Sequence, residues 1–147
     1  VLGGGGAARA VVYGLKKEEA KITITNRTIE KSAKLAKEFK VNFDNFGKIK
    51  KLIRNTDVLI NTTSVGMTPN QDNCILQEDD LIKGKIVMDV VYKPITTKLI
   101  KMARKKNCVT ITVDRMLIYQ AIRQFKLWTK VNPGFKQMEK ELLKQII

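Results

Sequence analysis

The sequence predicts an α/β domain, Rossmann-like and doubly wound, in which helices cover both faces of a mostly parallel sheet. Two observations carry this prediction. Short apolar runs alternate with longer amphipathic runs along the whole chain, which is the pattern of successive β-α-β units. The chain also opens on Val-Leu, four glycines and two alanines, as at a strand end, a tight turn and a helix start. With 147 residues the chain has the size of one domain, so we expect residues 1–147 to form a single one.

The first half of the chain alternates between strand and helix patterns. Residues 21–25 are β-branched and alternate in polarity, which predicts a strand. In residues 28–40 apolar side chains recur at helical spacing, and Thr28 stands where an N-cap is needed. The expected helices are residues 6–19, 28–40 and 46–55, and the expected strands are residues 21–25, 41–43 and 57–61.

The second half opens with a long polar passage, residues 62–80, and a loop of this length in a compact domain is usually functional. Pro133 and Gly134 separate the last two helices, and we expect Trp128, in the earlier of these, to be a packing residue. The expected strands here are residues 85–91 and 109–113, and the expected helices are residues 97–107, 116–130 and a last one ending at Ile147.

The opening glycines have the spacing of a phosphate-binding turn. Gly3 would make the tight turn, Gly5 would let the backbone approach a diphosphate, and Ala8 would let the helix pack closely against the strand. The amides of the first helical turn have no partners inside the helix, and the positive end of the helix dipole lies behind them. Four successive glycines also suit a flexible linker. The residues at the end of the next strand are needed to distinguish a phosphate-binding turn from a linker.

The end of the second strand indicates a particular dinucleotide. NAD-binding domains place an acidic residue there for the adenosine ribose hydroxyls, whereas this chain reads Thr25-Asn26-Arg27-Thr28. Arg27 can face a 2′-phosphate with its planar guanidinium, Thr28 can donate its hydroxyl, and Lys31 lies one helical turn on. An isolated arginine at a strand end is more often a solvated turn residue. Combined with the glycine spacing, it predicts NADP(H) as the cofactor.

Composition narrows the classes of function. The net charge of +14 would attract nucleic acid, but the lysines are spread over every expected helix without interleaved aromatics, so a nucleic-acid partner is not favoured. There is no histidine, and Cys74 and Cys108 lie far apart in sequence, so neither a metal site nor a disulfide is expected. No apolar run approaches the ~20 residues of a membrane span. We therefore expect a soluble, cytoplasmic protein with no membrane partner.

Five stretches of the chain resemble, in order and spacing, the NADP-binding C-terminal domain of the shikimate dehydrogenase family. Each stretch is modest evidence alone, but five in register are specific. The stretches are Gly3-Gly4-Gly5-Gly6-Ala7-Ala8-Arg9, Asn26-Arg27-Thr28, Asn61-Thr62-Thr63-Ser64-Val65-Gly66-Met67, Asp89-Val90-Val91-Tyr92-Lys93-Pro94 and Met116-Leu117-Ile118-Tyr119-Gln120. The resemblance implies an oxidoreductase that reversibly reduces 3-dehydroshikimate to shikimate with NADPH, on the pathway to chorismate and the aromatic amino acids.

The resemblance also implies a role for each matching position. Thr63 and Ser64 would lie in the loop that passes the ribose and nicotinamide of the cofactor, and Val90 and Val113 would line the nicotinamide. The residues implied at the diphosphate are Gly3, Gly4, Gly5, Gly6 and Ala7, and those implied at the 2′-phosphate are Asn26, Arg27, Thr28 and Lys31. The residues implied to reach the hydroxyl and carboxylate region of the substrate are Tyr92 and Gln120.

The chain departs from the family pattern in one loop. Val113 and Arg115 stand where the family usually has glycines. A β-branched residue resists a positive φ, so the backbone at Val113 cannot follow a glycine-only conformation without strain. This departure bears on how the nicotinamide is placed.

The family's acid/base pair, a lysine and an aspartate, belongs to an N-terminal substrate domain that this chain lacks. The chain begins within a strand and without an initiating methionine, so we expect a part of a longer polypeptide, with no catalytic residue of its own and a substrate shared with that other domain. Alone it should bind NADP(H) and turn over little or nothing. Three points stay open: an NAD-accepting quinate/shikimate dehydrogenase, a non-catalytic NADP-binding regulatory module, and the oligomeric state, a homodimer included.

Overall fold

The computed structural model describes residues 1–146, in which strands and helices alternate along the chain. The strands are β1 (Thr23–Asn26), β2 (Asn42–Asn45), β3 (Val58–Asn61), β4 (Ile86–Asp89) and β5 (Val109–Ile111). The helices are α1 (Gly6–Lys17), α2 (Ile29–Phe39), α3 (Ile49–Arg54), α4 (Lys98–Lys105), α5 (Val113–Thr129) and α6 (Phe135–Ile146). Two short 3-10 helices are η1 (Phe46–Lys48) and η2 (Glu78–Asp80).

Leu2 joins two groups of parallel strands into one sheet. β1 pairs with β2, and β4 pairs with β3 and β5, all in parallel. Leu2 lies between them as a parallel bridge to Thr25 on one side and to Asn61 on the other. Its amide donates to the carbonyl of Ile60 over 2.8 Å, and its carbonyl accepts from the amide of Thr62 over 2.8 Å. The spatial order is β2, β1, Leu2, β3, β4, β5, which is the order of a doubly wound sheet and confirms the predicted fold class.

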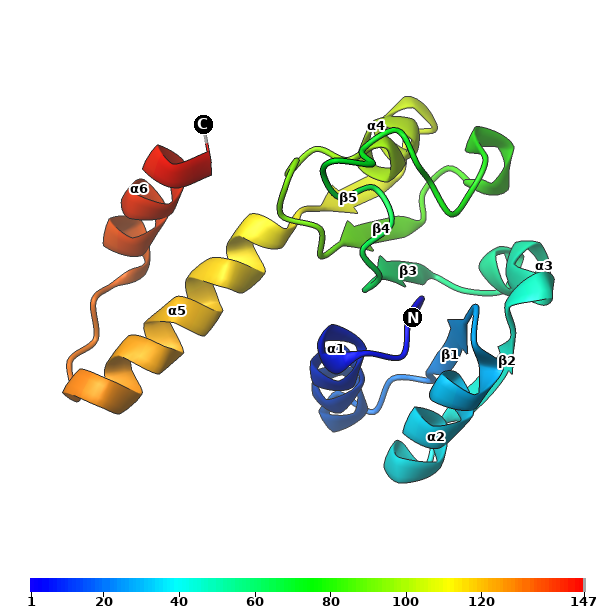
Figure 1. Cartoon of the computed structure of the whole chain (residues 1–147), viewed down its shortest axis with the longest axis horizontal. Helices are drawn as coiled ribbons and strands as arrows, with labels where there is room; N and C mark the ends of the chain where they lie inside the picture. Colours follow the sequence, from blue (N-terminus) through cyan, green and yellow to red (C-terminus); the bar gives the residue numbers. More distant parts are fainter. Residues whose placement is uncertain (147) are drawn as a thin grey trace.

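Two apolar clusters form the core because successive strand residues point to opposite faces of the sheet. α2 lies beside β1 and β2 with α1 next to it, whereas α4 lies beside β4 and β5 (Figure 1). One cluster consists of Ala8, Val12, Ile22, Ile24, Leu35 and Ala36. The other contains Leu2, Ile49, Ile53, Leu59, Leu76, Leu81, Val87, Leu99 and Ala103. The core thus holds the carboxyl ends of the central strands in fixed positions.

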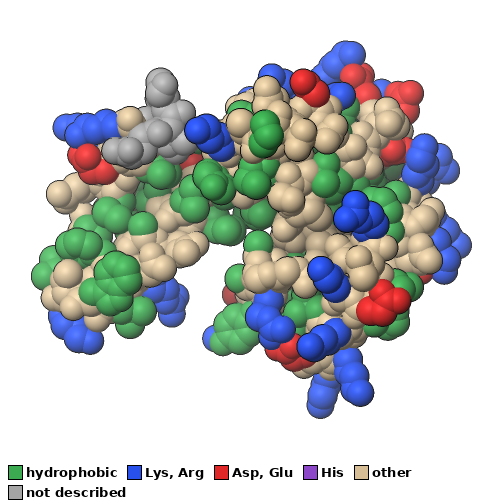
Figure 2. Space-filling model, viewed as in Figure 1, with side chains coloured by type: hydrophobic (Ala, Val, Ile, Leu, Met, Phe, Trp, Pro, Cys, Tyr) green, Lys and Arg blue, Asp and Glu red, His purple; other side chains and the backbone are tan. Residues whose placement is uncertain are grey.

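The last two helices extend away from the sheet as an arm. α5 leads away from the end of β5 and α6 returns beside it (Figure 1). The two helices contact each other through the rings of Tyr119 and Phe135, whose centroids are 5.3 Å apart. Apolar side chains gather on the surface of this arm, whereas basic side chains are scattered over the rest of the face shown in Figure 2. Trp128 is 78% exposed, so the expectation that it is a packing residue was wrong.

The boundary between β5 and α5 also differs from the sequence prediction. Val113, expected at the end of a strand, is the first residue of α5. The Thr112 hydroxyl donates to the Asp114 carboxylate at this point, and the chain turns into a helix after Ile111. The non-glycine residues of the described chain with φ in the left-handed region are Glu19, Lys40, Asn107 and Lys130. Val113 is not among them, so the valine adopts a conformation without the strain expected for a glycine position.

Two further observations concern the described residues. No helix within residues 1–146 is long and apolar enough to cross a membrane. In the same part of the chain no group of three or more cysteine, aspartate or glutamate side chains could hold a metal ion, and Cys74 and Cys108 are free thiols. The prediction that the last helix ends at Ile147 falls on a residue outside the described part.

Candidate functional site

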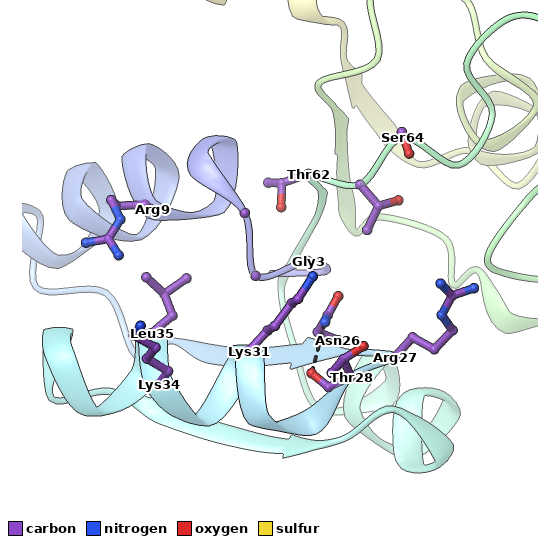
Figure 3. A pocket seen from close by; sticks show the side chains of 13 residues that line it. Gly3, Arg9, Asn26, Arg27, Thr28, Lys31, Lys34, Leu35, Thr62 and Ser64 are labelled. Atoms are coloured by element: carbon purple, nitrogen blue, oxygen red, sulfur yellow. Dashed lines mark hydrogen bonds between the residues drawn. The ribbon is translucent and has the colours of Figure 1, made fainter.

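A cavity of about 480 Å³ opens at the carboxyl ends of the central strands, where doubly wound sheets bind their ligands. Its walls come from the turn after Leu2, the end of β1 with the first turns of α2, and the loop after β3 (Figure 3). The structure brings together these residues predicted from the sequence: Gly3, Gly4, Gly5, Asn26, Arg27, Thr28, Lys31, Thr63 and Ser64. It adds Arg9, Lys34, Leu35 and Thr62, which sequence reasoning did not place there.

Gly3 makes the tight turn at the floor of the cavity. Its φ is +118°, in the region that favours glycine, and an added Cβ would lie 2.5 Å from Oγ1 of Thr62. That hydroxyl is itself held, because it donates to the carbonyl of Leu2 over 2.6 Å. At Gly4 a Cβ would lie 3.0 Å from Cβ of Lys31, so the turn also passes close to α2. A Cβ added at Gly5 would meet nothing within 4 Å, and Gly5 lines the cavity.

The amino end of α1 points into this space with its amides free for an anion. Gly5 is the N-cap and offers no side-chain cap, and the first turn contains no acidic residue. The positive end of the helix dipole is therefore uncompensated by the protein. Ala8 is fully buried in the apolar cluster with α2, which is the close packing expected of the third small residue. Gly6 and Ala7 belong to the same first turn of α1 but do not line the cavity.

Cationic side chains from β1 and α2 form the opposite wall. Arg27 projects from the end of β1, and Lys31 reaches from α2 toward Gly3 (Figure 3). Asn26 fixes the start of this wall, because its side-chain amide donates to the carbonyl of Thr28 over 2.9 Å. The salt bridges of residues 1–146 include no carboxylate partner for Arg27, Lys31 or Lys34. These three charges are available to a ligand anion.

Arg9 differs from the other cations of the cavity. Its guanidinium is paired with the carboxylate of Glu38 and lies 5.9 Å from the ring centroid of Phe39. Its charge is thus largely matched within the protein. The net positive field over the cavity comes from α2 and the end of β1 instead.

The remaining predicted residues lie outside this cavity. Val113 is 1% exposed and is the first residue of α5. Val90 is half-buried just after β4, and Tyr92, two residues further on, is 52% exposed. Gln120 is exposed on α5. The structure therefore separates the side chains implied at the nicotinamide and the substrate from the cavity that holds the glycine turn and the cations.

The family models match both ends of the chain. The model described as shikimate / quinate 5-dehydrogenase matches residues 1–90, and the model described as shikimate 5′-dehydrogenase C-terminal domain matches residues 115–143. The chain belongs to the shikimate / quinate 5-dehydrogenase family. This assignment confirms the resemblance that the five sequence stretches indicated.

Curated and solved members of the family match almost the whole chain. A shikimate dehydrogenase (NADP(+)) of Methanosarcina mazei is 41% identical over 99% of this chain and 55% of its own length. A crystal structure of a shikimate dehydrogenase in complex with NADP+ has a TM-score of 0.91 and 38% identity, over 99% of this chain and 53% of its own. A quinate dehydrogenase from Corynebacterium glutamicum in complex with NAD has a TM-score of 0.92 and 30% identity, over 97% of this chain and 53% of its own. The chain spans about half the length of the relatives it matches.

Proposed function

We propose that residues 1–147 form one NADP(H)-binding domain of a shikimate dehydrogenase. The observation that carries the proposal is that Arg27 and Lys31 line one cavity together with the glycine turn, with no carboxylate at the end of β1. A guanidinium suits the planar oxygens of a 2′-phosphate, and the free amides of α1 suit a diphosphate. The relatives named for NADP(+) support this choice of cofactor.

The reaction proposed for the whole protein is the reversible reduction of 3-dehydroshikimate to shikimate. NADPH, when bound, supplies the hydride. The residues of this chain hold the cofactor by its phosphates, whereas Val90 and Val113 would approach the nicotinamide and Tyr92 and Gln120 the substrate. In this chain Val90, Tyr92 and Gln120 are at least partly open to solvent. We expect a second part of the protein to cover them and to supply the acid/base pair.

A second candidate is a quinate dehydrogenase that uses NAD. The similarity to the NAD complex of the Corynebacterium glutamicum enzyme favours it. The two candidates differ in the ratio of the affinities for NADPH and NADH, because only NADPH offers a 2′-phosphate to Arg27. A preference for NADH by this chain would favour the second candidate.

The proposal predicts the effect of Arg27→Ala on cofactor binding. The variant should weaken NADPH by about 1.5 to 3 kcal/mol and leave NADH nearly unchanged, because it removes a hydrogen bond between two charged groups. Titration of each cofactor by calorimetry measures both affinities.

Arg54→Ala is the matched control, because Arg54 is an exposed arginine on α3 that does not line the cavity. It should leave both affinities unchanged. If Arg27→Ala lowered the affinities for NADPH and NADH equally, Arg27 would not be a ligand of the 2′-phosphate.

A further inference from the structure

A buried polar network lies behind the wall of the cavity formed by residues 62–64. It begins at Asp89, the last residue of β4, which is fully buried. One carboxylate oxygen accepts from the side-chain amide of Asn61 over 3.0 Å and from the backbone amide of Val91 over 3.1 Å. The other accepts from the Thr97 hydroxyl over 2.7 Å. Burial raises the pKa of Asp89, and the three donors oppose that rise.

The side-chain amide of Asn61 links Asp89 to Thr63 in the cavity wall by hydrogen bonds. Its nitrogen donates to Asp89, so its carbonyl oxygen must face the opposite way. That oxygen accepts from the backbone amide of Thr63 over 3.0 Å and from the Thr63 hydroxyl over 2.7 Å. The Thr63 hydroxyl in turn accepts from the amide of Val65 over 3.2 Å. The orientation of one buried amide thus fixes the backbone on both sides of Ser64.

The same carboxylate holds the segment after β4. The Val91 amide is fixed one residue before Tyr92, and Thr97 is the N-cap of α4, whose hydroxyl accepts from the amide of Ile100 over 3.3 Å. Asp89 therefore connects the loop after β3, which lines the cavity, with the strand exit that carries Val90 and Tyr92.

We propose that Asp89 is a positioning residue, which orients the Thr63 and Ser64 wall through Asn61 so that it meets the half of the dinucleotide beyond the diphosphate. The inference rests on the proposed NADP(H) function. A carboxylate suits the position because it only accepts, and so accepts from all three donors at once. An asparagine would bring its own donor toward one of these groups. The side chain touches no ligand itself and acts through the backbone that it holds.

The test compares two ligands in the parent chain and in Asp89→Asn, which preserves the size of the side chain. NADP+ spans both walls, whereas adenosine 2′,5′-bisphosphate offers only the adenosine and its phosphates to Arg27, Lys31 and the glycine turn. In Asp89→Asn the affinity for NADP+ should fall about five- to tenfold, the effect of one well-placed hydrogen bond. The affinity for adenosine 2′,5′-bisphosphate should stay within about twofold.

The matched control is Val87→Ala. Val87 is 1% exposed on the same strand and belongs to the apolar core, so its truncation destabilises the fold without touching the network. It should leave the ratio of the two affinities unchanged.

Hydrogen exchange reports the position of the wall without any ligand. In Asp89→Asn the amides of Thr63 and Val65 should exchange about tenfold faster relative to the amide of Arg9 in α1, which donates to the carbonyl of the N-cap Gly5. Val87→Ala should not change this ratio. Asn61→Ser breaks the same connection at its middle and serves if Asp89→Asn does not fold.

The outcomes separate the two proposals. A loss of NADP+ affinity with retained adenosine 2′,5′-bisphosphate affinity supports the positioning role. Equal losses for both ligands, or no loss, overturn it. If the parent chain binds neither ligand, the proposed function fails, and the exchange of Thr63 and Val65 still decides whether Asp89 holds the wall.

Discussion

At the scale of single residues, the side-chain hydroxyl of Thr25 is buried without a hydrogen-bond partner in the described part of the chain. Thr25 is 3% exposed on β1, and its Oγ1 has no hydrogen-bond partner within residues 1–146. A buried hydroxyl without a partner costs free energy, since it gives up its bonds to water. Its backbone, in contrast, is fully used, because the amide donates to Val1 and the carbonyl accepts from Gly3.

Thr25→Val should therefore raise the free energy of unfolding by about 1 kcal/mol, because it removes the hydroxyl and keeps the branched shape. Urea unfolding measures the change. Thr23→Val, at a half-buried position of the same strand, is the control and should have little effect. A clear loss of stability in Thr25→Val would show that an ordered water satisfies the hydroxyl.

Most of the candidate site could be predicted because its residues are local to two turns. The glycine spacing and the tip of the second strand each place their groups by backbone geometry alone. Arg9 and Lys34 were missed, because they reach the cavity only through the packing of α1 against α2. Asp89 appeared within a matched sequence stretch, but nothing in the sequence shows that it contacts Asn61, 28 residues earlier.

At the scale of elements, the short helix α3 depends on a side chain from outside it. Lys85 precedes β4, and its ammonium donates to the carbonyls of Ile53 over 2.8 Å and Arg54 over 2.9 Å, and also to that of Thr56. These carbonyls lie at the carboxyl end of the helix, where a cation is favourable. One lysine thus ties the end of α3 to the start of β4.

Lys85→Met retains most of the aliphatic stem and removes these bonds, so it should lower the free energy of unfolding by about 1 to 2 kcal/mol. Exchange of the α3 amides should accelerate at the same time. Lys83→Met, at an exposed lysine nearby, is the control. Unchanged stability in Lys85→Met would mean that water caps the helix equally well.

The elements themselves were largely predictable, and the exceptions have local causes. The alternation of residues 109–113 continues the strand pattern through Val113, but β5 ends at Ile111 and α5 begins two residues later. The Thr112 hydroxyl donates to the Asp114 carboxylate at this point, where the chain turns from strand to helix. The hydrogen bonds of Lys85 to the end of α3 could not be predicted, because the sequence does not distinguish this lysine from a solvent-exposed lysine at the start of a strand.

At the scale of the whole molecule, the arm of α5 and α6 leaves large apolar side chains in water. Leu127 is 65% exposed, Trp128 78% and Val131 58%. The hydrophobic periodicity of residues 116–130 predicts a helix correctly. It does not show whether another part of this chain packs against the apolar face of that helix. This is why Trp128 was misjudged.

Trp128 is the single tryptophan of the sequence, so its fluorescence reports the arm alone. We expect emission typical of tryptophan in water and quenching by acrylamide nearly as efficient as for the free amino acid. Trp128→Gln should change the free energy of unfolding by less than about 0.5 kcal/mol, as at other exposed positions. Emission typical of an apolar environment would show that the arm is covered in solution.

The bridge at Leu2 has a mechanical consequence. The sheet consists of two groups of paired strands, β1 with β2 and β3 with β4 and β5, and the backbone of Val1, Leu2 and Gly3 joins them. Arg27 and Lys31 stand on one side of this segment, and Thr63 and Ser64 stand on the other. A dinucleotide bound across the cavity would therefore contact both groups of strands beside Leu2, the residue that bridges them, so we expect its binding to stabilise their pairing.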